Sequence, residues 1–81
     1  MKLYDYHGKC NCSGAHIRAL RKGLGLSQEA LAAKLQLAGL EISQHAISRV
    51  ENGLRIVPDY EINYFADALQ VSPLALLKLE K

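Results

Sequence analysis

Four polar side chains in the middle of the chain have residue types that suit hydrogen bonding to the edges of DNA bases. They occupy positions i, i+1, i+4 and i+5 of one expected helix, so they share one side of it. Arginine can pair with guanine O6 and N7, and glutamine with adenine N6 and N7, while serine and histidine bond to several edges. The apolar residues of this segment, Ile47 and Val50, fall on the other side and are expected to face a core. The candidate base-reading residues are Gln44, His45, Ser48 and Arg49.

The residues around this set also suit a helix that approaches DNA closely. Ser43 stands where an N-cap is expected, and the small side chain of Ala46 would let the helix lie deep in a groove. The same pattern is typical of the solvated face of any amphipathic helix. The segment 44–52 alone therefore leaves DNA binding and plain solvation as open alternatives.

A second set of residues near the N-terminus has the chemistry of metal ligands. His7, Cys10, Cys12 and His16 form the pattern H-x2-C-x-C-x3-H, and zinc binds thiolates and imidazoles. The C-x-C spacing differs from the usual C-x2–4-C, and no second cysteine pair follows. A disulfide between thiols one residue apart would be strained. We therefore expect free thiols in an N-terminal arm over residues 1–12 and no metal or other cofactor. The apolar residues of this arm that we expect to pack on the domain or on a partner are Leu3, Tyr4 and Tyr6.

Apolar residues recur at helical spacing through the rest of the chain, and no stretch alternates as a strand would. A residue that can cap a helix precedes each apolar stripe. The expected helices are 14–23, 28–38, 44–52, 60–70 and 73–80. Their expected N-caps are Ser13, Ser27, Ser43, Asp59 and Ser72. The pattern predicts an all-α, compact five-helix bundle over residues 13–81.

Length and composition limit the possible functions. The chain has 81 residues, 49% of them hydrophobic and 22% charged, which is typical of one small folded domain. No apolar run approaches the roughly 18 residues of a membrane span, so we expect a cytoplasmic protein without membrane contact. Residues 16–55 hold six basic and three acidic side chains, a modest bias toward polyanions. We see no grouping of nucleophile, base and acid, so we expect no enzyme.

Three stretches, taken together in their order and spacing, resemble the Cro/phage-repressor type of helix-turn-helix regulators, the xenobiotic-response-element family. These are residues 17–21 (IRALR), 25–32 (GLSQEALA) and 47–53 (ISRVENG). The resemblance covers about residues 14–79. It implies a lambda-repressor-like domain that binds double-stranded DNA as a transcriptional regulator, in the simplest case a repressor. It places the expected helix 44–52 in the major groove, where Gln44, His45, Ser48 and Arg49 would read bases.

The resemblance also implies roles for residues outside that helix. Gln28 would contact a DNA phosphate and the side chain of Gln44, and Arg55 would contact a phosphate. Ser43 would lie at the DNA surface. A scaffold ion pair would join Arg21 to Glu51.

One departure from the family pattern concerns the connection before the expected helix 44–52. The interval 36–42 is longer than usual by about one helical turn. We expect the preceding helix to extend to Ala38 and the connection to return Ile42 to the core. The angle between the two helices is the property that this departure puts in question.

Leucines of the last expected helix suggest a contact with a second copy. Leu74 and Leu77 share one stripe that we expect to complete the core, whereas Leu76 and Leu79 lie on the far side. We expect Leu76 and Leu79 to form a homodimer interface, so that the dimer reads half-sites about 34 Å apart. Two alternatives stay open. One is a protein-interaction module that holds a toxin or a polymerase subunit. The other is a metal or redox sensor built on the four N-terminal histidines and cysteines.

Overall fold

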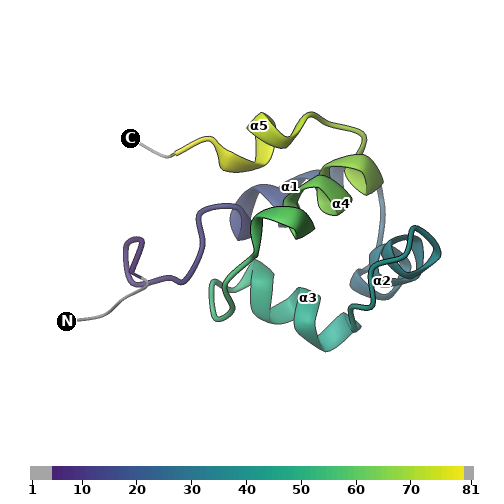
Figure 1. Ribbon diagram of the computed structural model, residues 1–81, viewed down its shortest axis with the longest axis horizontal. Coiled ribbons are helices and arrows are strands. Elements are labelled where there is room, and N and C mark those ends of the chain that lie inside the picture. Colours follow the sequence, from purple (N-terminus) through teal and green to yellow (C-terminus); the bar gives the residue numbers. More distant parts are fainter. Residues whose placement is uncertain (1–4, 80–81) are drawn as a thin grey trace.

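The computed structural model describes residues 5–79, which form five helices around one core (Figure 1). The helices are α1 (Gly14–Gly23), α2 (Gln28–Leu37), α3 (Gln44–Glu51), α4 (Asp59–Leu69) and α5 (Pro73–Leu77). Within residues 5–79 there is no strand, only an isolated bridge between Tyr6 and Lys9. The all-α prediction is therefore confirmed. No helix of this described part is long and apolar enough to cross a membrane.

Most expected helix boundaries agree with the structure to within one residue. The exception is α5, which ends at Leu77, whereas the sequence predicted a helix to position 80. The predictions for residues 1–4 of the arm, including Leu3 and Tyr4, and for residues 80–81 of the bundle lie outside the described residues.

The core lies where α1, α2, α3 and α4 meet, and α5 covers its upper side in Figure 1. The apolar residues at helical spacing on α4, Ile62, Phe65, Ala66 and Leu69, are all buried, and Phe65 is completely shielded from solvent. Burying a side chain of this size stabilises a fold by about 1.5–3 kcal/mol relative to leaving it exposed. The other fully shielded apolar side chains are Ile17, Leu31, Leu35, Ile47, Val50, Ala66 and Leu76.

The prediction for the two faces of α5 is wrong. Leu76 is completely buried, while Leu74 is 78% exposed and Leu77 44% exposed. The four leucines within positions 74–79 lie on different sides of a short helical segment, so their spacing alone does not determine which of them faces the core. Packing of α5 against α1 and α4 decides it, and it turns Leu76 into the core. Leu76 is therefore unavailable to a partner, whereas Leu79 is exposed as expected.

Two of the five expected N-caps form. The hydroxyl of Ser27 accepts from the Ala30 N–H and that of Ser43 from the Ala46 N–H, each at 3.0 Å. Ser13 and Ser72 make no side-chain cap, and Asp59 is itself the first residue of α4. An N-cap of this kind stabilises its helix by about 1 kcal/mol. The structure thus anchors the beginnings of α2 and α3 in the way that the sequence indicates.

The long connection between α2 and α3 is ordered by a tight helix ending. Gly39 has φ +106°, a backbone conformation that residues other than glycine rarely adopt. The N–H of the next residue, Leu40, donates to the Leu35 carbonyl at 2.9 Å. Ile42 is buried, as expected, and the Gln36 side chain donates to its carbonyl at 2.8 Å. The additional residues therefore lead directly into α3.

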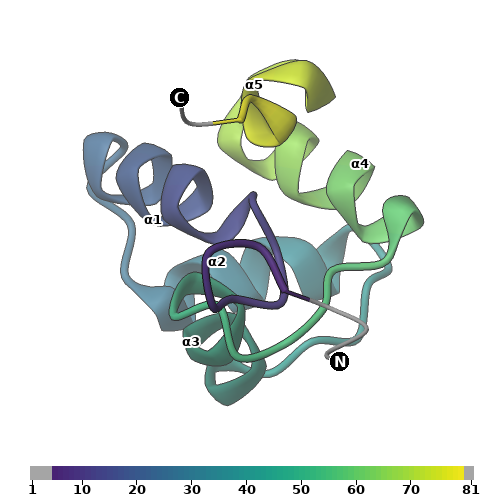
Figure 2. The ribbon, with the colours of Figure 1, turned by 90° about the vertical axis from the view of Figure 1, so that its left-hand side faces the viewer.

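The arm, residues 5–12, lies against the C-terminal end of α3 (Figure 2). Its tip is a tight turn in which Tyr6 and Lys9 exchange backbone hydrogen bonds of 2.7 and 2.9 Å. The arm then pairs with the loop after α3, where the Cys10 N–H donates to the Gly53 carbonyl at 2.8 Å. The backbone of this part of the arm is thus attached to the domain, and Tyr6, one of the apolar residues expected to pack, is half-buried.

Candidate nucleic-acid interface

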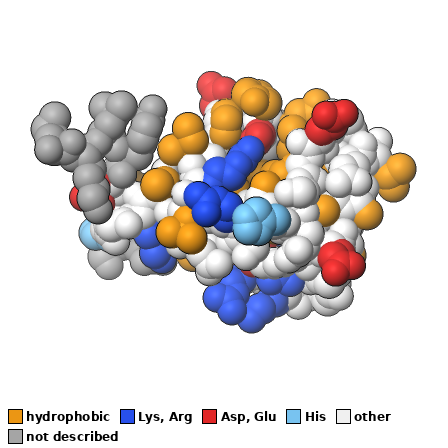
Figure 3. All heavy atoms as spheres, turned by 90° about the horizontal axis from the view of Figure 1, so that it is seen from below, with side chains coloured by type: hydrophobic (Ala, Val, Ile, Leu, Met, Phe, Trp, Pro, Cys, Tyr) orange, Lys and Arg blue, Asp and Glu red, His pale blue; other side chains and the backbone are white. Residues whose placement is uncertain are grey.

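Helix α3 presents the expected polar face to solvent. Ile47 and Val50 are completely buried, which fixes the rotation of the helix about its axis. The side chains on the opposite side are therefore directed away from the core. Seen from the α3 side, the molecule shows Lys and Arg side chains around a histidine, with most Asp and Glu side chains near the rim (Figure 3). The four predicted reading residues, Gln44, His45, Ser48 and Arg49, are all at least partly exposed.

The first residue of α3 is held by the first residue of α2. Gln44 Nε2 donates to Gln28 Oε1 at 2.6 Å, the contact that the family resemblance implies. The Gln28 amide is held in turn, because its Nε2 donates to Glu51 Oε1 at 3.1 Å. With its Nε2 facing Gln28, Gln44 keeps its amide oxygen available as a hydrogen-bond acceptor. A chain of side-chain hydrogen bonds thus orients a candidate reading residue before DNA arrives.

The expected ion pair between Arg21 and Glu51 forms in the interior. Arg21 Nε lies 2.7 Å from Glu51 Oε2, and Arg21 Nη2 lies 3.0 Å from Oε1. Both residues are buried, with 8% and 6% of their surface exposed. The hydrogen bonds that Arg21 donates to Glu51 raise the pKa of Arg21 above its usual value, against the opposing effect of burial. Because Arg21 Nη1 also donates to the Leu26 carbonyl at 2.7 Å, the pair ties α1, the loop before α2 and α3 together.

Arg55 makes an ion pair that the sequence reasoning missed. Its guanidinium grips Glu61 of α4 with contacts of 2.7 and 3.1 Å, and Nη1 also donates to the Ile56 carbonyl. The hydrogen bonds that Arg55 donates to Glu61 raise the pKa of Arg55 above its usual value. Glu61 is 5% exposed, so the arginine compensates a buried carboxylate. Arg55 is therefore held beside α4, with 30% of its side chain exposed toward solvent.

The C-terminal half of the reading face is partly ordered. Arg49 Nη2 donates to the Leu54 carbonyl at 3.2 Å, which places its guanidinium beside the turn that follows α3. Asn52 Nδ2 lies 3.5 Å from Ser48 Oγ, at the outer limit of a hydrogen bond. These contacts are exposed, so hydrogen bonds to a bound molecule can replace them at little cost in free energy.

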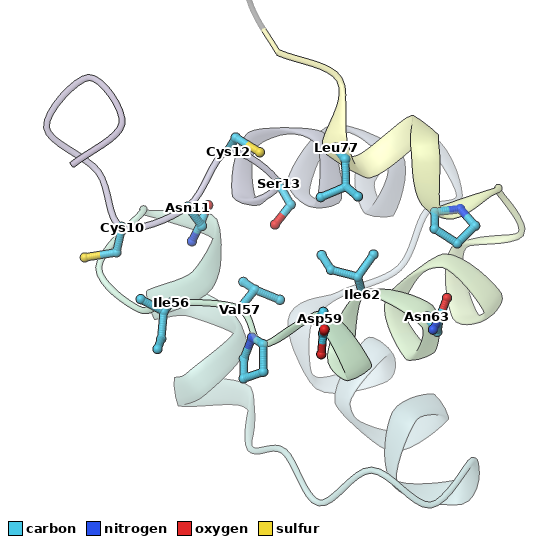
Figure 4. A pocket seen from close by; sticks show the side chains of 12 residues that line it. Cys10, Asn11, Cys12, Ser13, Ile56, Val57, Asp59, Ile62, Asn63 and Leu77 are labelled. Carbon is cyan, nitrogen blue, oxygen red and sulfur yellow. The ribbon is translucent and has the colours of Figure 1, made fainter. Parts of the chain in front are cut away.

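The histidines and cysteines of the N-terminal segment do not converge. Within residues 5–79 no group of three or more His, Cys, Asp or Glu side chains is arranged to hold a metal ion. His16 Nε2 donates instead to the Lys78 carbonyl at 2.6 Å, and both Cys10 and Cys12 are free thiols. The two sulfur atoms point away from one another (Figure 4). The alternative of a metal sensor therefore finds no support in the arrangement of these residues.

Asn11 is a positioning residue that the sequence reasoning missed. Its Nδ2 donates to the Val50 carbonyl at 3.1 Å and to the Arg55 carbonyl at 2.7 Å, while its Oδ1 accepts from the Gly14 N–H at 2.8 Å. The last bond gives α1 the cap that Ser13 does not provide. Gly14 fits closely here, since a Cβ on it would overlap the Val50 carbonyl oxygen. An asparagine three residues before a helix was the available signal, and the nearer Ser13 obscured it.

An apolar hollow of about 560 Å³ opens between the arm, the loop before α4, and α5 (Figure 4). The Cys12 side chain lies on its arm side, and Ile56 and Val57 line it from the loop. Ile62 of α4 and Leu77 of α5 complete the apolar wall. The partly exposed Ile56 and Leu77 extend this surface outward.

Comparisons with known proteins agree with this geometry. Residues 14–79 match the profile of a helix-turn-helix domain, which spans α1 to α5. The fold is similar to that of the restriction-modification controller protein C.AhdI from Aeromonas hydrophila, with a TM-score of 0.68 and 35% sequence identity. The similarity covers 78% of this chain and 84% of C.AhdI. No curated protein sequence matches the chain.

Proposed function

Because the chain belongs to the Cro/C1-type helix-turn-helix family, we propose that it binds specific double-stranded DNA sequences and thereby represses transcription. The single observation that carries this proposal is the hydrogen-bonded chain from Arg21 through Glu51 and Gln28 to Gln44. It holds the start of α3 rigidly while the reading face stays open to solvent. Preorganised side chains lose less conformational entropy on binding than free ones. The similar protein C.AhdI is named a controller, which supports a regulatory role.

In this proposal the DNA contacts divide into two kinds. Gln44, His45, Ser48 and Arg49 read base edges in the major groove. Phosphate contacts set the position of the protein on the duplex. Gln28, Ser43 and Arg55 make these contacts from the ends of α2, α3 and the loop after α3. Glu61 orients Arg55 for this purpose, because its carboxylate leaves the Nε–H and one Nη2–H of Arg55 for a phosphate oxygen. Such a regulator acts in the cytoplasm, where bacterial DNA lies.

Selection from a randomised duplex pool tests the proposal directly. We expect the purified protein to retain an inverted repeat whose half-sites lie about 34 Å apart, as a two-fold dimer requires. Enrichment of one half-site alone would keep specific DNA binding and contradict the dimer. Folded protein that enriches nothing at low salt would contradict the proposed function and favour a protein-interaction module.

The dimer in this proposal forms around the apolar hollow. Leu74 and Leu77 lie three residues apart on α5 and are both exposed, and Leu79 follows them. In a two-fold contact the same helix and hollow occur on both copies, so the leucines of one copy can cover the hollow of the other. An exposed apolar surface of this kind is typical of interaction sites. The interface is thus expected at Leu74, Leu77 and Leu79, with Leu76 supporting it from the core.

A charge placed in the hollow should separate the two copies. We expect Leu77→Glu to sediment as a monomer of 8.9 kDa at concentrations where the unmodified protein sediments at twice that mass. The matched control is Leu37→Glu, because Leu37 is 90% exposed on α2, away from the hollow. It should remain dimeric and bind the selected repeat normally. A dimeric, folded Leu77→Glu variant would show that the interface lies elsewhere.

A further inference from the structure

We propose that the N-terminal arm is a second DNA-contacting element, in which the Lys9 ammonium binds a backbone phosphate beside the end of α3. This inference rests on the proposed function and adds a contact that the helix-turn-helix itself does not contain. The matched helix-turn-helix segment begins at residue 14, so the arm lies outside it.

The arm is attached to the DNA-reading helix and not to a distant part of the domain. The Cys10 N–H donates to the Gly53 carbonyl, and the Asn11 amide donates to the carbonyls of Val50 and Arg55. All three acceptors belong to the last turn of α3 or to the loop that follows it. Three hydrogen bonds within two residues give the arm a defined position relative to the reading face. The position of α3 on DNA therefore also determines the position of the arm.

The stem of Lys9 lies across the backbone of Gly53. A Cβ built on Gly53 would come within 2.7 Å of Lys9 Cγ and 2.8 Å of its Cβ and Cδ. Gly53 also has φ +75°, so both its conformation and its space favour glycine. The backbone of Lys9 is fixed by its two bonds with Tyr6. The Lys9 stem is thus packed in place, while the residue as a whole is exposed.

The surroundings of Lys9 favour an anion. Arg49 bonds to the Leu54 carbonyl, so two cationic side chains flank the turn 52–54. The nearest carboxylate along α3, Glu51, is buried and already paired with Arg21. Asp5 of the arm accepts from the Gly8 N–H, and no ion pair involves Lys9 within the described residues. An exposed lysine and an arginine that flank one turn, neither of them in an ion pair within residues 5–79, are suited to phosphate.

The arm lies between the reading helix and the hollow proposed to bind the second copy. Cys10 and Asn11 both bond to the end of α3 and line the hollow. In a two-fold complex Lys9 therefore faces the DNA segment between the two half-sites. Its contact would not read a base, and it would add affinity for the centre of the operator.

The salt dependence of DNA binding tests the contact. Each phosphate neutralised by a protein cation contributes a slope of about −0.9 to the plot of log affinity against log salt concentration. We expect Lys9→Gln to make this slope shallower by about 0.9 per arm. The matched control is Lys22→Gln, because Lys22 is exposed in the last turn of α1, outside the arm, α3 and the proposed dimer interface. Its slope should equal that of the unmodified protein. An unchanged slope for Lys9→Gln would overturn the proposal.

A second variant tests the role of Asn11 as a positioning residue. Asn11→Asp keeps the oxygen that caps α1 but removes both donor bonds to the end of α3. We expect Asn11→Asp to make the plot of log affinity against log salt concentration shallower by the same amount as Lys9→Gln does. The double variant Lys9→Gln/Asn11→Asp should show no further change in this slope. If the changes in slope of the two single variants added fully in the double variant, Asn11 would not act through Lys9. That result would overturn the proposal that Asn11 holds the arm in position for the Lys9 contact. A folded, unmodified protein that fails to bind any duplex would contradict the proposed function itself.

Discussion

Replacing Glu51 by alanine is expected to lower the free energy of unfolding by about 3–5 kcal/mol, because the change leaves a buried guanidinium without its counter-charge. Arg21 is only 8% exposed, so water cannot take the place of the lost carboxylate. Small domains have a total stability of about 5–15 kcal/mol, so this single change removes a large part of it. Urea denaturation followed by circular dichroism measures the difference directly.

The matched control is Glu41→Ala, which removes an exposed carboxylate from the loop between α2 and α3. We expect a change within about 0.5 kcal/mol there. The double variant Arg21→Met/Glu51→Met should recover most of the stability, since a buried ion pair is commonly replaceable by apolar side chains. Its DNA affinity should nevertheless stay reduced, because Gln28 loses the oxygen that orients its amide. A loss below about 1 kcal/mol for Glu51→Ala would contradict the structural role assigned to the pair.

The second large effect concerns recognition and not stability. We expect Arg49→Ala to reduce discrimination at one base pair of the selected repeat by about 1–3 kcal/mol, or about 5–150-fold. The fold should be unaffected, because Arg49 is exposed and its bond to the Leu54 carbonyl is exposed too. Competition between the repeat and duplexes substituted at single positions measures this discrimination.

The control for Arg49→Ala is Arg18→Ala, which removes an exposed arginine from α1, outside the reading face. It should preserve the ranking of the substituted duplexes even if it lowers affinity for all of them. If Arg49→Ala weakened every duplex equally, the residue would be a phosphate contact and its reading role would be wrong.

The sequence predicts the elements of this fold better than the contacts between them. The apolar stripe of α4 and the caps Ser27 and Ser43 are local patterns, and they appear in the structure as expected. The contact of Gln28 with Gln44 joins distant residues, and only the family resemblance indicated it. Physical reasoning on single segments could not have paired these two side chains, because their contact depends on the angle between α2 and α3.

The missed features share one physical cause. The burial of Leu76 depends on how α5 packs against α1 and α4, and the pairing of Arg55 with Glu61 depends on the path of the loop between them. The three bonds of Asn11 depend on where the arm crosses α3. Each of these contacts joins segments whose relative position no local pattern determines. The roles of individual residues in DNA contact stay predictions.

Helix α3 divides its eight residues between two tasks that scarcely overlap. Ile47, Val50 and Glu51 hold the domain together from one side, whereas His45 and Arg49 on the other side contribute little to the core. Substitutions at His45 should therefore change the preferred operator at almost no cost in folding. Gln44 is less free to vary, because its partner Gln28 would have to change with it. Related regulators could thus diverge in target sequence through one or two exposed positions and avoid recognising each other's operators in a shared cell.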